Sequence, residues 1–282
     1  SDYSTIVSLG NTSKGYSYSL SAKIDKHFEF GLDLMAAYTY GHSYTCNDGL
    51  SSQAHSNLST LKSVDINNPE LSYSIFDQPH KVSAVAMYTS PSYAGGLMRT
   101  SISLTYSGTS GQRYSYIFYD TTDTDINGDG IALNTLLYIP TEDEVLSMNW
   151  SKNADAVAFE DFITSDKYLR THRGQWSERN AGISPFEHHF DMQIAQDIFY
   201  DKANKRKLQV TLDVVNLSNM LNRNWGLYYA NSLYRAPLTV DGKTVDAAGN
   251  VTPKYSFRED NVNYLSDLSS RWRCQLGVNL TF

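Results

Sequence analysis

The sequence predicts an all-β fold in which antiparallel β-strands cross a membrane as part of a β-barrel. Three observations support this prediction. Apolar and polar residues alternate with period two over segments of about ten residues. The connections between these segments are short and long in turn, and aromatic residues gather near the segment ends. No apolar run reaches the roughly 20 residues that a transmembrane helix needs.

The first two predicted strands share one phase of alternation. Apolar residues occupy the even positions of residues 16–24 and again of residues 28–40, which leaves residues 26 and 27 as a two-residue turn. Five further segments alternate in the same way. They are residues 82–88, 102–118, 190–194, 208–214 and 272–282. Most of these seven segments approach the roughly 9–11 residues that a tilted membrane strand needs.

The lengths of the connections favour a barrel over a soluble sheet. Residues 41–79, 120–185 and 218–270 form long connections, and the connections between them are short. All long connections therefore fall at one end of the strands, as in outer-membrane barrels, which have short periplasmic turns and long extracellular loops. Alternation alone also fits an antiparallel sandwich with one solvated face, but soluble domains rarely contain connections longer than about 15 residues.

The positions of aromatic and charged side chains give the predicted sheet two faces. Amphipathic rings favour the level of the lipid headgroups, so aromatic residues near strand ends indicate two girdles. These residues are Tyr16, Tyr18, Phe28, Phe30, Tyr38, Tyr40, Tyr88, Tyr106, Phe190, Tyr200 and Trp272. Charge on the lipid side costs about 2 to 4 kcal/mol for Arg or Lys at midplane, so the charged set is expected to face the lumen. This set includes Glu29, Asp33, Asp191, Asp213, Arg271 and Arg273.

Composition and motifs exclude several other classes of function. The 23 Lys and Arg against 30 Asp and Glu give a net charge of −7, and the one basic cluster, residues 202–207, lies in a short turn, so no nucleic-acid partner is expected. No GxSxG elbow, phosphate-binding loop or HExxH helix occurs, and we expect no enzyme activity. Cys46 and Cys274 imply neither a disulfide framework nor a zinc site.

Several short segments, taken in their order and spacing, resemble one receptor family. They are Phe76-Asp77-Gln78-Pro79-His80-Lys81, Asp125-Ile126-Asn127-Gly128-Asp129-Gly130, Leu137-Tyr138-Ile139-Pro140-Thr141, His172-Arg173-Gly174-Gln175, Glu178-Arg179-Asn180, Asp213 to Asn216, Leu221-Asn222 and Asn224-Trp225-Gly226. Together they resemble the C-terminal portion of TonB-dependent outer-membrane receptors of the Oar type. Those receptors carry a carboxypeptidase-regulatory-like domain at the N-terminus. The final alternating strand that ends in Phe282 resembles the signal read by the barrel assembly machinery.

The resemblance implies a large barrel of the 22-stranded class, plugged by an N-terminal domain. Residues 1–282 would then be the C-terminal portion of the barrel domain, with the plug and the N-terminal domain absent. It implies location in the cell outer membrane and energy-coupled uptake of an unidentified external substrate. The implied partners are outer-membrane lipid, the barrel assembly machinery through Phe282, and TonB through the absent N-terminal part.

Two other classes of function remain open from the residues alone. Tyr3, Thr5, Val7 and Leu9 could form an eighth strand, which would close a small passive or structural barrel. A secreted calcium-dependent binding module with a sandwich fold is the second alternative.

Residues 123–130 contain a partial calcium motif. Asp123, Asp125, Asn127 and Asp129 place an oxygen ligand at every second position, as a loop that wraps a hard cation requires. The bidentate glutamate that usually closes such a loop is missing, which predicts weak affinity. An Asp/Asn/Gly turn that only reverses the chain is the alternative.

A second candidate site combines arginine and tryptophan near the start of a strand. Arg170, Arg173, Trp176 and Arg179 predict a surface for a polar or anionic ligand, because guanidinium groups and aromatic faces recognise such groups. An internal network of arginines and carboxylates that stabilises a long folded loop fits the same residues.

Overall fold

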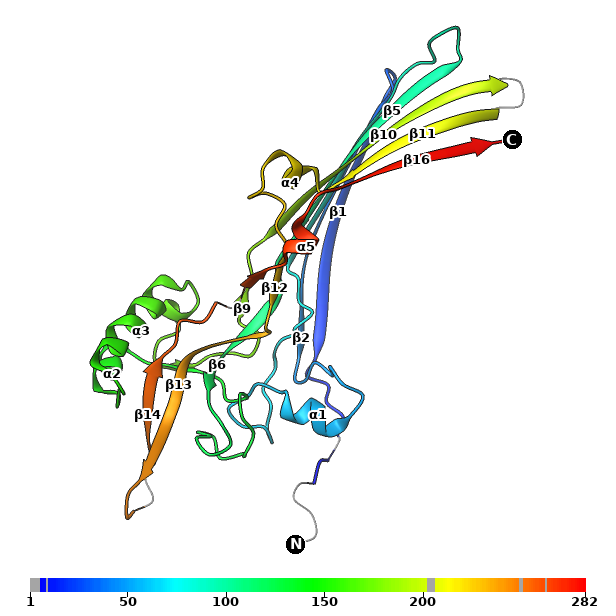
Figure 1. Ribbon diagram of the computed structural model, residues 1–282. Helices are drawn as coiled ribbons and strands as arrows, with labels where there is room; N and C mark the ends of the chain where they lie inside the picture. The colour runs from blue at the N-terminus through cyan, green and yellow to red at the C-terminus, as the bar shows by residue number, and fades with distance from the viewer. Residues whose placement is uncertain (1–5, 9, 202–205, 249–250, 262) are drawn as a thin grey trace.

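The computed structural model describes residues 6–8, 10–201, 206–248, 251–261 and 263–282, and it places a long single-layer sheet beside a separate body of loops (Figure 1). Among these residues, seven long strands pair in the order β1-β2-β4-β5-β10-β11-β16, and every neighbouring pair is antiparallel. The strands are β1 (Tyr16–Phe28), β2 (Leu32–Thr45), β4 (His80–Thr89), β5 (Met98–Thr109), β10 (Glu187–Asp201), β11 (Arg206–Val215) and β16 (Arg273–Thr281). The short β3 (Ser72–Tyr73) pairs with the end of β2. The predicted antiparallel β fold is confirmed.

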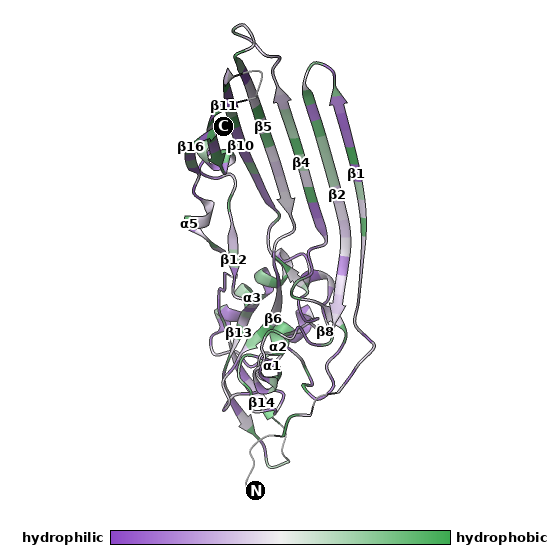
Figure 2. Ribbon diagram, turned by 90° about the vertical axis from the view of Figure 1, so that its right-hand side faces the viewer, coloured by the Kyte–Doolittle hydropathy of each residue, from purple (hydrophilic) through white to green (hydrophobic). Residues whose placement is uncertain are grey.

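The strand register keeps the even-numbered apolar residues on one face. Ile24 pairs with Ala36, which in turn pairs with Ala84, and hydropathy alternates along β2, β4 and β5 in Figure 2. Leu20 and Leu276 on this face are 73% and 72% exposed. No second sheet within the described ranges covers this face, so a two-layer sandwich does not fit the structure.

The opposite face carries the odd-numbered polar residues. Asp213 pairs with Gln193, which donates a hydrogen bond to it at 2.6 Å, and Gln193 pairs with Ser103. Asp33 and Asp191 share this parity. Two of the predicted lumen-facing residues lie outside the strands, because Glu29 is in a turn and Arg271 precedes β16.

Several strand boundaries differ from the sequence prediction, since β2, for example, runs to Thr45, into the predicted connection 41–79. β1 continues through residues 26 and 27 to Phe28, and the turn comprises residues 29–31, where Gly31 has φ +94° and donates a backbone hydrogen bond to Phe28. The backbone pairing continues through Lys26 and His27, which lie opposite Leu34 and Asp33, although the charged Lys26 interrupts the apolar phase. The positive φ at position 31 favours glycine there. The predicted strand 102–118 is also two strands, since the chain leaves the sheet after Thr109 and re-enters β structure at β6 (Arg113–Tyr119).

Both edges of the long sheet are open within the described ranges, because β1 pairs only with β2 and β16 only with β11. The proposed eighth strand falls largely outside those ranges, since Tyr3, Thr5 and Leu9 are not described. Val7 is described and lies in no strand.

The three long connections form one body at the same end of the sheet (Figure 1). This loop body comprises residues 46–79, 110–186 and 216–272, excepting residues 249, 250 and 262. Its helices are α1 (Ala54–Ser59), α2 (Glu142–Ser147), α3 (Asn153–Ser165), η1 (Leu169–Thr171), α4 (Leu217–Leu221) and α5 (Asp267–Ser270). Its other strands are β7 (Tyr138–Ile139), β8 (Gln175–Trp176), β9 (Gly182–Ile183), β12 (Tyr229–Asn231), β13 (Tyr234–Val245), β14 (Val251–Phe257) and β15 (Asn263–Leu265).

The loop body has its own hydrophobic core. A small sheet in the order β14-β13-β6-β9 packs against α2 and α3. The buried core residues are Tyr114, Tyr116, Phe118, Leu137, Ile139, Val145, Phe159, Ile163, Leu169, Leu238 and Val240. Helix α2 begins at a capping box in which Thr141 and Glu144 each accept the other's backbone N–H. The long connections are therefore folded structure rather than extended linkers.

Candidate ligand-binding site

Two hollows in the loop body share the side chains of Lys62 and Arg179. The first, of about 300 Å³, is also lined by Asp48, Asn180 and Tyr234. The second, of about 280 Å³, is also lined by Asp65, Glu70, Trp176 and Glu178. Residues of the first and second long connections line both hollows, and the third connection adds Tyr234 to the first. Two cations, Lys62 and Arg179, line both.

Lys62 is a largely buried cation. Its Nζ donates to the carbonyl of Leu133 at 2.7 Å and lies 5.2 Å from the ring centroid of Tyr234. Burial lowers the pKa of Lys62 to about 8, although the carboxylate of Asp120 opposes the shift. Near neutral pH the amine is therefore mostly protonated, and it would attract an anionic group entering either hollow.

Arg179, in the second long connection, is hydrogen bonded to the end of β2 and to the first long connection. Its guanidinium donates to the carbonyls of Thr45 and Cys46, and its own carbonyl accepts a hydrogen bond from Ser72 Oγ at 2.5 Å. The Nε atom is buried and has no hydrogen-bond partner among the described residues; the nearest carboxylate, Asp48 Oδ2, lies 4.0 Å away. Burial lowers the pKa of Arg179, but an arginine stays charged, so this N–H is a free donor in a sheltered place.

A buried ion pair contacts the segment that lines the first hollow. Arg113 donates to Asp77 from Nε at 2.8 Å and from a terminal nitrogen at 2.7 Å. Asp77 also accepts the backbone N–H of Ser43 at 2.7 Å. The Arg113 guanidinium lies 3.7 Å from the ring centroid of Tyr73 and donates to the carbonyl of Asn180 at 3.2 Å. We call Asp77, Arg113 and Tyr73 the clasp, because they join the end of β2 to both connections.

The four predicted ligand-binding residues do not all line the same hollow. Trp176 is 42% exposed, contacts Phe118 and Tyr138 edge to face, and lines the second hollow with Arg179. Arg173 instead forms a two-point ion pair with Glu160 of α3, and Arg170 is exposed; neither lines the two hollows. Ligand binding by the four residues stays a prediction.

The predicted calcium residues form a compact hydrogen-bonded turn. Asp125 accepts the backbone N–H of Asn127 at 3.0 Å and of Gly130 at 2.8 Å. Asp129 accepts hydrogen bonds from the side chains of Asn127 at 3.0 Å and Asn134 at 2.6 Å, whereas Asp123 is exposed. No group of three or more His, Cys, Asp or Glu side chains arranged for a metal ion occurs in the described ranges. Calcium binding stays a prediction.

Sequence reasoning missed Lys62 and Asp48 as neighbours of Arg179, and it did not place Asp48 against the side chain of Asn180. Lys62 contacts residue 133 and Asn180 contacts residue 48, so the contacts join positions far apart in the chain. No local period marks such residues.

A single-layer sheet of long antiparallel strands, apolar on one exposed face, is typical of a membrane-embedded β-barrel protein. Residues 1–228 match the family model of the outer membrane beta barrel domain, and the chain belongs to that family. The protein is accordingly located in the outer membrane. No curated protein and no solved structure matches the chain. None of the helices in the described ranges is both long and apolar enough to span a membrane.

Proposed function

We propose that residues 1–282 form the C-terminal part of the barrel of a TonB-dependent receptor that takes up an external substrate. The observation that carries this proposal is the pair of open edges on β1 and β16. An unpaired edge within a bilayer leaves backbone polar groups without partners, which costs several kcal/mol for each group. Pairing of these edges with further strands removes that cost and enlarges the barrel toward the 22-stranded class.

The loop body is proposed to capture the substrate. Short turns of outer-membrane barrels face the periplasm, so the loop body would lie outside the cell. The hollows at Lys62 and Arg179 offer two cations, a sheltered donor and an exposed indole, which suit a polar or anionic group. Entry would then require movement of a plug coupled to TonB, a step that belongs to the proposal and to the parts outside residues 1–282.

The chain alone gives a direct test of the open-edge proposal. Residues 1–282 refolded in detergent are expected to remain protease-sensitive and to show no heat-modifiable mobility on gels. A protease-resistant, heat-modifiable species formed by these residues alone would show that they close a small barrel, and the receptor proposal would then fail.

The complete protein tests energy coupling against passive transport. A receptor with a plug is expected to bind the periplasmic domain of TonB and to show almost no conductance in a planar bilayer. Steady conductance without TonB binding would instead show a passive barrel. Deletion of Phe282 is expected to reduce the amount assembled in the outer membrane, and unchanged assembly would remove the proposed role of this residue in recognition by the assembly machinery.

A further inference from the structure

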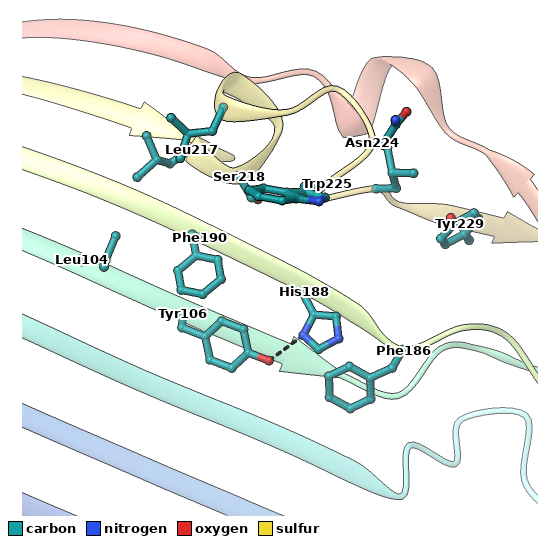
Figure 3. Close-up of a pocket in the computed structure, with 13 residues that line it drawn as sticks. Leu104, Tyr106, Phe186, His188, Phe190, Leu217, Ser218, Asn224, Trp225 and Tyr229 are labelled. Atoms are coloured by element: carbon teal, nitrogen blue, oxygen red, sulfur yellow. Dashed lines mark hydrogen bonds between the residues drawn. The ribbon is translucent and has the colours of Figure 1, made fainter.

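A groove of about 710 Å³ lies between the apolar face of the sheet and a segment that folds back over it. The segment, residues 217–229, contains α4 and lies beside the sheet in Figure 1; we call it the overhang. Figure 3 shows Phe190 and Tyr106 on the sheet side of the groove and Trp225 on the overhang. The groove is separate from the two hollows at Lys62.

The sheet side of the groove belongs to the face that contacts lipid. Leu104 pairs with Met192, and Tyr106 pairs with Phe190, so all four share the even parity of the apolar face. The neighbouring odd residues Ser103 and Gln193 face the other way. Because the protein is located in the outer membrane, the groove is continuous with the surface that the hydrocarbon covers.

The overhang exposes large apolar side chains toward the same region. Leu221 is 68% exposed and Trp225 is 57% exposed, and both line the groove together with Leu217. Exposed leucine and tryptophan beside a lipid-facing surface are costly in water and favourable at the membrane interface. The overhang therefore extends the apolar surface of the sheet.

A hydrogen-bonded hub fixes the shape of the overhang. Asn216 has φ +57° and caps α4, and its side-chain amide donates to the carbonyls of Gly226 at 2.7 Å and Ser270 at 2.8 Å. Gly226 has φ +60°, and a Cβ atom there would lie 2.0 Å from Asn216 Oδ1. The groove is thus preformed, so an occupant would not have to order the overhang on binding.

The end of the groove nearest the loop body is polar. His188 Nδ1 and the hydroxyl of Tyr106 share a hydrogen bond of 2.8 Å (Figure 3), and Asn224 lies on the overhang side. Arg223, next to Asn224 in the chain, is exposed and takes part in no ion pair among the described residues. An apolar groove with a polar end, lined by a residue whose chain neighbour is an exposed arginine, matches a lipid with an acyl chain and an anionic headgroup.

We infer that the groove holds one acyl chain of an anionic, phosphate-bearing outer-membrane lipid, with its headgroup toward His188 and Arg223. The continuity with the lipid-facing surface supplies the acyl chain, and the exposed Arg223, one residue from the groove-lining Asn224, would supply the attraction to phosphate. The volume lies within the roughly 300–1,000 Å³ of sites that hold small molecules. This inference does not depend on transport, because a passive barrel would present the same groove.

Lipid retained by the complete protein gives the test. The protein is reconstituted in vesicles of phosphatidylethanolamine with a minor fraction of phosphatidylglycerol, extracted into detergent, and examined by native mass spectrometry. One retained phosphatidylglycerol per chain is expected. Leu104→Trp fills the groove and should reduce retention at least tenfold, whereas Leu276→Trp, on the same face but outside the groove, should leave it unchanged. Heat-modifiable mobility verifies that each variant is folded.

Arg223→Ala tests the headgroup contact without filling the groove. One cation near an anionic surface alters binding by about fivefold, so the preference for phosphatidylglycerol over phosphatidylethanolamine should fall by about that factor. Absence of retained lipid from the folded wild type would overturn the inference. Equal retention by Leu104→Trp and Leu276→Trp would overturn it as well, as would a protein dimer that Leu104→Trp alone disrupts.

Discussion

Removal of the negative charge of the clasp, by Asp77→Asn, is expected to open the loop body while leaving the barrel strands folded. Asp77 is 2% exposed and receives hydrogen bonds from Arg113, His42 and the backbone of Ser43. The asparagine keeps one acceptor oxygen but loses the charge. Arg113, which is 5% exposed, would then be a buried cation without a carboxylate partner.

Breaking a buried pair by removing one partner costs about 3–5 kcal/mol. The lower end applies here, because the amide oxygen of the substituted side chain would still accept one hydrogen bond and because the Arg113 guanidinium keeps its contact with Tyr73. A cost of about 3 kcal/mol raises the open population by roughly 150-fold. Where opening and closing are fast compared with cleavage, the rate of proteolysis rises by the same factor.

Limited proteolysis of the membrane-inserted protein measures this effect. Cleavage within residues 46–79 or 110–186 should accelerate strongly in Asp77→Asn, while heat-modifiable mobility of the strands persists. The control is Asp267→Asn, which breaks an exposed ion pair with Arg271 and should change cleavage little, since such pairs contribute about 0–1 kcal/mol. Equal cleavage rates for wild type and Asp77→Asn would refute the assignment of the clasp as the support of the loop body.

Three further outcomes are expected. The pKa of Lys62 is about 8 in the folded protein and near 10.5 when unfolded, so the unfolded chain binds more protons between pH 8 and 10.5. The free energy of opening the loop body should therefore rise with pH in this range, by up to about 1.4 kcal/mol per pH unit, and resistance to proteolysis should rise with it. Lys62→Met should abolish that rise, and persistence of the full slope would contradict the assignment. Gly226→Ala should displace the overhang by its contact with Asn216, so Trp225 emission should change, and an unchanged spectrum would show that the hub is not rigid. If the turn at residues 123–130 binds calcium, calcium should slow proteolysis of the turn in the wild type. The protection should be smaller in Asp123→Ala, which removes an exposed carboxylate without breaking the turn. No effect of calcium on proteolysis of the wild type would exclude binding.

The strands can be predicted from the sequence because the membrane imposes one strict rule. Each residue of a spanning strand faces either hydrocarbon or the polar side, so the period of two is repeated in every strand, as in Leu20, Leu34 and Leu276. Strand boundaries are less predictable, since β1 continues through Lys26 to Phe28 although that charged residue interrupts the apolar phase. The break after Thr109 depends on Gly111, where a Cβ atom would lie 2.5 Å from the carbonyl of Pro185, a contact no local pattern reveals.

The candidate site is far less predictable than the strands. Arg179 belongs to a distinctive segment of the sequence, but its partners Thr45 and Cys46 lie more than a hundred positions earlier. Proximity in the chain groups Arg170 and Arg173 with it, yet Arg173 turns to Glu160. In an irregular loop body, contacts between distant segments decide where each side chain lies, and sequence spacing does not encode those contacts.

The short strand β12 links the first hollow to the groove on the apolar face of the sheet. At one end Tyr229, which lines the groove, donates its backbone N–H to Glu187 at the end of β10, at 3.0 Å. At the other end the Asn231 side chain donates to the carbonyl of Gln112 at 3.2 Å. Tyr234, three residues further along the chain, lines the first hollow. Because both ends are hydrogen bonded, the hollow cannot shift far from the sheet without breaking these contacts. The contacts of β12 therefore couple the position of the first hollow, which Lys62 lines, to that of the groove on the apolar face of the sheet.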